Sequence, residues 1–291
     1  MPYHGVISNE KGKIMGLKIR FLLTSKCTAT CGYCHNEGQS QAGNLLSLDT
    51  IRQVLHTLHA NACQPEEIVL SGGEPTLHKQ LGDIARLCRA SGAHVSMDSH
   101  AGHPSLLAAA LPYLDELKVH VDSFDAAEQQ ASMGIELAQV LTSIRQAQSY
   151  PLQLRTNHPL KCAQETATFI RHARQVGIDC KIIEMFGQNG HVSLDDMDWS
   201  AQGYHAQVDG SWLHDDGLHR LFTKRCGAHH NDDDTLFIGA DGIRRTLNGV
   251  IIGRPEAFSI KMVRTALLPN AYTLTQGSRQ FCQKPQGLCP Y

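Results

Sequence analysis

The chain has 291 residues, 42% of them hydrophobic, and a formal net charge of −2 with its 17 histidines neutral. This composition suffices for one large α/β domain, alone or with a small appendage. The charge balance excludes a basic field of the kind that binds nucleic acid or anionic membranes, and no apolar run approaches the ~20 residues of a membrane span. Ten cysteines without a recognisable export signal favour metal or redox chemistry in a reducing cytoplasm over disulfides.

Apolar and amphipathic segments alternate over the first 186 residues. Strands are expected at 17–24, 67–70, 93–97, 116–121, 151–156 and 180–184. Helices are expected at about 47–61, 77–91, 104–111, 125–147 (with a break near Gly134) and 163–176. Six strand–helix alternations indicate parallel βαβ units with right-handed crossovers. The predicted fold class is therefore α/β, a partial (β/α)6 TIM-like barrel with its chemistry at the carboxyl ends of the strands.

The pattern becomes polar and irregular after residue 186. Two short apolar runs, 235–238 and 243–247, flank an Asp-Gly turn and predict a β-hairpin. We therefore place a domain boundary near residue 187. It separates a barrel core (1–186) from a small, irregular α+β extension (187–291).

Three cysteines follow the first predicted strand directly. Cys27, Cys31 and Cys34 have the spacing C-x3-C-x2-C. Three thiolates on one loop can hold three irons of a cubane cluster and leave the fourth iron open to another ligand. Zinc is an alternative, but closed zinc sites usually show two close ligand pairs, and the next cysteine is Cys63. Three unrelated buried thiols are the other alternative.

A second motif, Ser-Gly-Gly-Glu-Pro at 71–75, ends the second predicted strand. With the cysteine triple and the aromatic Tyr33, it resembles the radical S-adenosylmethionine (SAM) superfamily, whose signature is C-x3-C-x-aromatic-C followed by a "GGEP" turn. The resemblance implies a partial barrel, a catalytic [4Fe–4S] cluster on Cys27, Cys31 and Cys34, and SAM bound at its open iron. An ordinary glycine-rich βα turn is the alternative for 71–75.

The resemblance also implies a set of SAM contacts. Gly72 and Gly73 would let the backbone approach SAM, since no Cβ intervenes. Glu74 would supply a negative charge for the amino group, and Tyr33 would pack near the adenine. Looser matches at the ends of later strands add further candidates beside SAM, its carboxylate, ribose or adenine: Ser99, Ser123, Arg155, Asn157, Met185 and Phe186.

Three cysteines lie in the predicted extension: Cys226, Cys282 and Cys289. Related superfamily members carry a second [4Fe–4S] cluster in a small Twitch or SPASM-like extension, so the resemblance implies the same here. The cysteine that usually follows the hairpin turn is absent, because Thr246 and Leu247 stand there. A lone catalytic thiol or inert cysteines remain alternatives. The other cysteines are expected to pack in the core: Cys63, Cys88, Cys162 and Cys180. Scattered histidines and aspartates at 214–234 are expected to be a solvated surface rather than a metal site.

The branch of closest resemblance is the GTP 3',8-cyclase of molybdenum-cofactor synthesis. It implies an enzyme that cleaves SAM reductively to a 5′-deoxyadenosyl radical, which abstracts hydrogen from the substrate. The arginine-rich stretch that binds triphosphate in that cyclase is replaced here by a segment, 228–234, that ends in three aspartates and would repel it. We therefore expect a peptide or small-metabolite substrate and an electron donor such as flavodoxin or ferredoxin, with neither nucleic acid nor membrane as partner. GTP cyclisation and, from another class, a non-catalytic iron–sulfur redox sensor remain alternatives.

Overall fold

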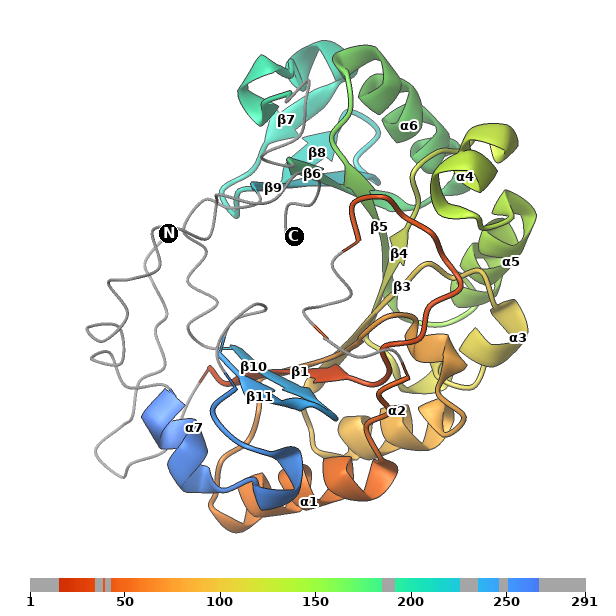
Figure 1. The fold of residues 1–291 in the computed structure, drawn as a ribbon. Coiled ribbons are helices and arrows are strands. Elements are labelled where there is room, and N and C mark those ends of the chain that lie inside the picture. Colours follow the sequence, from red (N-terminus) through yellow and green to blue (C-terminus); the bar gives the residue numbers. More distant parts are fainter. Residues whose placement is uncertain are drawn as a thin grey trace, which may run out of the picture.

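A computed structural model describes residues 16–34, 39, 43–184, 192–225, 235–245 and 251–266. Its strands form one eleven-stranded sheet in the order β11-β10-β1-β2-β3-β4-β5-β6-β9-β8-β7. The sheet curves into an open ring, and the helices cover its outer side (Figure 1). Among the described strands β11 and β7 are the two edges, so the ring is not closed. The predicted partial barrel is confirmed.

Eight strands of this sheet run parallel to one another. They are β1 (Lys18–Leu22), β2 (Glu67–Ser71), β3 (His94–Ser99), β4 (Glu116–His120), β5 (Gln153–Pro159), β6 (Asp179–Glu184), β9 (Arg220–Arg225) and β10 (Thr235–Gly239). Three short strands pair antiparallel at the two ends: β7 (Tyr204–Ala206), β8 (Trp212–His214) and β11 (Gly242–Arg244).

The described helices are α1 (Leu48–Ala60), α2 (Leu81–Ala90), α3 (Pro104–Leu107), α4 (Ala126–Met133), α5 (Leu137–Ala147), α6 (Ala163–Val176) and α7 (Ile260–Ala266). Short 3₁₀ turns lie at Pro75–Leu77, Leu111–Tyr113, Leu194–Asp196, Ser200–Gln202 and Pro255–Ala257. None of these helices combines the length and hydrophobicity needed to cross a bilayer.

Local sequence signals explain several of the helix boundaries. The Ser47 side chain accepts a hydrogen bond from the Thr50 amide and begins α1. Gly134 adopts a φ of 69° and separates α4 from α5 at the predicted break. Gly177, with a φ of 77°, ends α6 in the same left-handed conformation. Each predicted strand and helix of the barrel is present, with shifts of a few residues at its ends.

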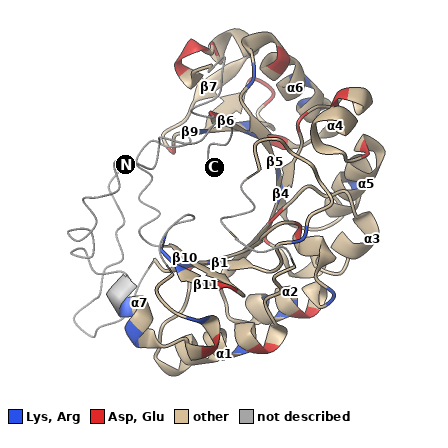
Figure 2. Cartoon of the chain, viewed as in Figure 1, with Lys and Arg blue, Asp and Glu red and all other residues tan. Residues whose placement is uncertain are grey.

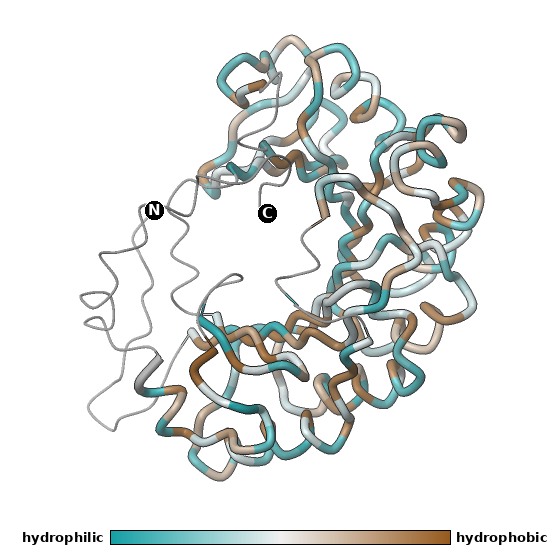
Figure 3. The backbone as a smooth tube through the Cα atoms, viewed as in Figure 1, coloured by the Kyte–Doolittle hydropathy of each residue, from teal (hydrophilic) through white to brown (hydrophobic). Residues whose placement is uncertain are grey.

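The hydrophobic core lies between the sheet and the outer helices. In β1, Ile19 and Phe21 are fully buried, whereas Lys18 and Arg20 line a cavity inside the ring. This alternation follows from the two-residue repeat of a strand. Hydrophobic and hydrophilic stretches alternate along the outer helices (Figure 3), which also carry acidic and basic residues interspersed on the outside (Figure 2). The inner face of the sheet, which the helices do not cover, carries polar side chains such as Lys18 and Arg20.

The strands after residue 187 join the barrel sheet. β9 pairs in parallel with β6, and β10 pairs in parallel with β1. The predicted hairpin is confirmed as β10–β11, with Gly239 opposite Gly242. The boundary placed near residue 187 itself lies outside the described residues. The division into core and extension stays a prediction, but the two regions share one sheet.

Candidate active site

A cavity of about 490 Å³ lies on the inner side of the sheet. Its lining comes from β1 to β6, β9 and β10, together with the loop that follows β1. Cys27, Cys31 and Cys34 line one part of it, beside Gly72 and Gly73. A cavity of this size suits a cofactor or small-molecule site. The two sequence motifs therefore meet at one place.

The cysteine loop places three thiols on the wall of one cavity. The Ala29 amide donates a hydrogen bond to Cys27 Sγ over 3.3 Å, and the Cys34 amide donates to the Cys31 carbonyl over 3.1 Å. Desolvation by the surrounding protein, with a smaller contribution from nearby negative charges (Glu74 for Cys27, Asp122 for Cys31), raises the pKa of the Cys27 thiol to about 11 and that of Cys31 to about 12. A cationic metal centre would favour the thiolate form.

This donor set fits an open iron–sulfur cubane better than a zinc ion. Within the described ranges, no three Cys, His, Asp or Glu side chains are arranged to hold a single metal ion. A closed zinc site needs four such ligands around one ion. A cubane places each thiolate on a different iron, so its three thiols need not converge on one ion. Cys27 and Cys34 are exposed and Cys31 is half-buried, which leaves all three accessible from the cavity.

The Gly72–Gly73 turn fastens the cysteine loop to the end of β2. The Gly73 amide donates to the Thr24 carbonyl over 2.7 Å, and the Glu74 amide donates to the Lys26 carbonyl over 2.7 Å. A Cβ on Gly72, whose φ is 129°, would lie 2.5 Å from the Thr24 carbonyl oxygen, and one on Gly73 would overlap the carbonyl of Lys26. Only glycine permits this backbone approach.

The Glu74 side chain, predicted to supply a negative charge for the SAM amino group, is enclosed by hydrogen-bond donors of the protein. It is fully buried and is not part of the cavity lining. One carboxylate oxygen accepts from the Thr76 amide and hydroxyl and from Ser99 Oγ at 2.8 Å; the other accepts from the His100 amide at 3.0 Å. Glu74 thus ties the ends of β2 and β3 together. Ser99 lines the cavity, but its hydroxyl donates to Glu74.

Tyr33 belongs to a polar group at the end of β4. Its hydroxyl donates to Asp122 and lies 2.6 Å from His120 Nε2, and His120 Nε2 is 3.5 Å from the same carboxylate. Burial alone would raise the pKa of Asp122, but hydrogen bonds from His120 and Tyr33 and the positive charge of His120 lower it overall. These bonds hold the Tyr33 ring at the cavity wall.

At the end of β4, it is His120 that lines the cavity. The Ser123 hydroxyl donates to Glu128 over 2.7 Å and is absent from the cavity lining. Sequence reasoning missed His120, although strand alternation could have indicated it. Lys118 and His120 are two residues apart on β4 and both line the cavity, whereas Val119 and Val121 are fully buried in the core.

Arg155 and Asn157 both line the cavity from β5. Arg155 forms an ion pair with Glu116, and its guanidinium carbon lies 4.7 Å from the centre of the Phe222 ring. The buried Oδ1 of Asn157 has no hydrogen-bond partner among the described residues. The Asn157 amide is therefore available to a ligand.

The remaining candidates divide between described and undescribed parts of the chain. Met185, Phe186, Cys226, Cys282 and Cys289 lie outside the described residues. Cys63, Cys88 and Cys180 are buried as predicted, but the prediction for Cys162 was wrong, because it is exposed where α6 begins. His214 and His219 both contact Asp216, at 2.9 and 2.8 Å, without forming a metal site among the described residues.

An open barrel of parallel strands with a three-cysteine loop at its central cavity is typical of one class of enzymes. The chain belongs to the radical SAM superfamily, whose model matches residues 21–192, more than half of its length. Members of this superfamily are enzymes that use a [4Fe–4S] cluster and SAM.

Proteins named GTP 3',8-cyclase are among the relatives to which the chain is similar. It is 30% identical to the GTP 3',8-cyclase of Synechococcus elongatus over 201 residues, covering 64% of this chain and 58% of the cyclase. It is 28% identical over 141 residues to a probable GTP 3',8-cyclase of Pyrococcus abyssi, covering 47% of this chain and 45% of that protein. The chain spans about half the length of the curated relatives it matches.

Solved structures show the same fold at low sequence identity. Streptococcus suis SuiB bound to S-adenosylmethionine matches with a TM-score of 0.60 and 13% identity, over 79% of this chain and 60% of SuiB. Native anSMEcpe with bound AdoMet matches with a TM-score of 0.57 and 10% identity, over 85% of this chain and 80% of that one. At such identities the likeness concerns the fold alone.

Proposed function

We propose that this protein cleaves SAM reductively at a [4Fe–4S] cluster held by Cys27, Cys31 and Cys34, and abstracts hydrogen from a peptide or small-metabolite substrate. The observation that carries the proposal is the meeting of the cysteine loop and the Gly72–Gly73 turn on one cavity of about 490 Å³. When bound, the cluster and SAM supply a 5′-deoxyadenosyl radical. A cytoplasmic location and an electron donor such as flavodoxin or ferredoxin belong to the same proposal.

The protein's own residues would hold and orient the reactants. The three thiols bind the irons, and the glycine turn keeps their loop against β2. Tyr33, fixed by Asp122 and His120, forms a wall against which a planar group can pack. Asn157, with its unpartnered oxygen, offers a hydrogen-bond acceptor. We assign the other candidates, Ser99, Arg155 and Met185, to the SAM site on the sequence resemblance alone.

The test compares cysteine variants after anaerobic reconstitution with iron and sulfide. With SAM and dithionite, the wild-type protein should form 5′-deoxyadenosine, and Cys31→Ala should form none, because its cluster loses one of three ligands. Cys162→Ala is the matched control, since Cys162 is exposed and is not part of the cavity lining. Absence of 5′-deoxyadenosine from the reconstituted wild type, or zinc in place of iron, would refute the proposal.

Formation of a cyclic purine product from GTP is the second candidate reaction. The names of the curated relatives and the basic side chains in the cavity favour it. The aspartates of 232–234, which lie outside the described residues, disfavour triphosphate binding. Mass spectrometry of a reaction with GTP, SAM and dithionite separates the two candidates: a product isomeric with GTP would establish the cyclase.

The second cluster is a separate proposal for the predicted extension. Its ligands would be Cys226, Cys282 and Cys289, which lie outside the described residues. Two cubanes contain about eight irons, so the iron content should fall towards four in Cys226→Ala. An iron content of about four in the intact protein would rule the second cluster out.

A further inference from the structure

The inner wall of the cavity carries more positive than negative charge. Six cationic side chains line it, contributed by β1, β4, β5, β6 and β9: Lys18, Arg20, Lys118, Arg155, Lys181 and Lys224. Three carboxylates on neighbouring strands pair with four of these cations. Arg20 pairs with Asp98 and Arg155 with Glu116; Lys18 lies 3.4 Å from Glu67, and Lys118 lies 3.3 Å from Glu116 and 3.6 Å from Glu67.

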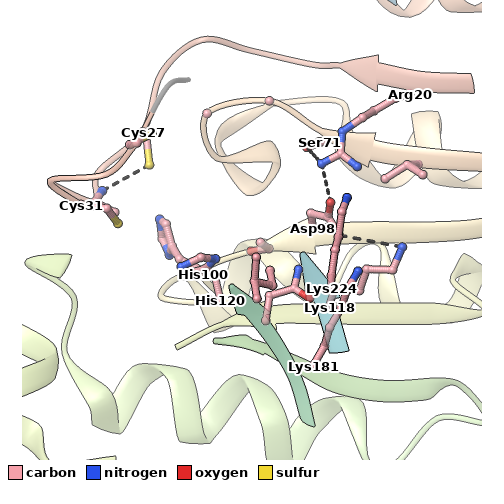
Figure 4. Close-up of a pocket in the computed structure, with 18 of the residues that line it drawn as sticks. Arg20, Cys27, Cys31, Ser71, Asp98, His100, Lys118, His120, Lys181 and Lys224 are labelled. Atoms are coloured by element: carbon pink, nitrogen blue, oxygen red, sulfur yellow. Dashed lines mark hydrogen bonds and ion pairs between the residues drawn. The ribbon is translucent and has the colours of Figure 1, made fainter. Parts of the chain in front are cut away.

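Lys181 and Lys224 are left without such partners. Among the described residues, neither ammonium group has an ion pair or hydrogen bond. The two lysines project from adjacent parallel strands, because Lys181 is on β6 and Lys224 pairs with Ile183 of the same strand. Figure 4 shows them with Lys118, away from Cys27 and Cys31. Six basic side chains against three carboxylates leave an excess of basic groups in this wall.

The two lysines line the same cavity from neighbouring strands. Burial, and then the charges of Lys224 and Lys118, lower the pKa of Lys181 to about 7, and Asp98 offsets part of this effect. Half-buried cations that face one another are unfavourable unless an anion lies between them. Asn157 lines the same wall in register with Lys181, and its oxygen has no partner among the described residues.

We propose that Lys181 and Lys224 bind an anionic group of the substrate, a carboxylate or a phosphate, at the wall of the cavity away from the cysteine loop. The anion would fix one end of the substrate there and direct the rest towards the cluster. This inference rests on the proposed function in taking the cavity as the substrate site.

The test measures anion binding to the reconstituted full-length protein in the presence of SAM. Equilibrium dialysis with labelled inorganic phosphate and, separately, labelled succinate reports the two chemistries. Loss of a charge-assisted contact of about 1.5–3 kcal/mol corresponds to about 10- to 100-fold weaker binding. We expect this loss in Lys181→Met and in Lys224→Met, and retention in Lys181→Arg. The stronger of the two anions identifies the substrate's charged group.

Lys18→Met is the matched control. It removes the same charge from the same cavity, but Lys18 is already paired with Glu67 and half-exposed. We expect less than a threefold change, because the anion site is at β6 and β9. Equal weakening by all three methionine variants would mean a general positive potential and would overturn the site. So would binding that survives both Lys181→Met and Lys224→Met, or no binding of either anion.

The wild-type 5′-deoxyadenosine assay separates this inference from the proposed function. If the wild type forms 5′-deoxyadenosine but binds neither anion, the anion site is wrong and the radical SAM function stands. If it binds an anion through Lys181 and Lys224 but forms no 5′-deoxyadenosine, the proposed function fails and the anion site stands.

Discussion

The carboxylate of Glu74 accepts hydrogen bonds from Thr76 in the turn after β2 and from Ser99 and His100 at the end of β3, and it is closed to solvent. A motif identifies such a residue but does not say which of its neighbours it contacts. The reverse holds for His120, which no motif indicated and which the alternation of β4 places in the cavity. At the scale of single residues, the role of a side chain such as Glu74 or His120 therefore depends on which residues the adjacent strands place beside it.

His158 provides a test of pH dependence at this scale. Its ring is buried against Phe169, with centres 3.7 Å apart, and its Nδ1–H donates to the Val121 carbonyl over 3.0 Å. Burial lowers the pKa of His158 from 6.5 to about 3. Between these two pKa values His158 is protonated in the unfolded chain but neutral in the folded chain. Its contribution to stability is therefore complete above pH 6.5 and is lost as the pH falls towards 3.

We expect His158 to contribute a fall of about 1.4 kcal/mol in the free energy of unfolding per pH unit below its unfolded pKa. Urea denaturation at pH 7, 6 and 5 should show a shallower decline for His158→Gln than for the wild type. His56→Gln, on the exposed side of α1, should retain the wild-type slope. Identical slopes for His158→Gln and the wild type would show that His158 is not buried in its neutral form.

At the scale of structural elements, the cysteine loop and the Gly72–Gly73 turn meet at the cavity. Gly73→Ala should displace the cysteine loop, because its Cβ would overlap the Lys26 carbonyl. Overpacking of this kind costs about 1–3 kcal/mol. We expect reduced iron content and reduced 5′-deoxyadenosine formation, with the far-ultraviolet circular dichroism spectrum preserved.

Gly32→Ala is the control for this prediction. Gly32 belongs to the same cysteine loop, but a Cβ there would meet no atom within 4 Å. Iron content should therefore stay at the wild-type level in Gly32→Ala. If both variants, or neither, lost iron, backbone contact at Gly73 would not be what positions the loop.

At the scale of the whole molecule, the described strands from β1 to β11 form a single curved sheet. β10 covers the edge of β1, and β9 covers the edge of β6. A chain of residues 1–186 would expose both edges and would lack the buried core residues Leu221, Leu236 and Ile238. Exposed strand edges of this kind promote association.

We therefore expect the 1–186 fragment to be aggregated or much less stable than the full chain, and the full chain to unfold in one transition. Size-exclusion chromatography and calorimetry measure both properties. A soluble, monomeric fragment with the melting temperature of the intact protein would show instead that the predicted core is an independent domain.

The amino-acid sequence by itself determined the order of strands and helices in the barrel, the break at Gly134, the β10–β11 hairpin and the cysteine loop. Each depends on local causes: hydrophobic period, capping, glycine conformation and ligand spacing. The tertiary structure alone decided that β9 and β10 extend the sheet, that Glu74 is enclosed, and that Lys181 and Lys224 line one cavity from adjacent strands without carboxylate partners among the described residues. These features arise between strands far apart in the chain, where pairing and burial depend on the folded neighbours rather than on local sequence.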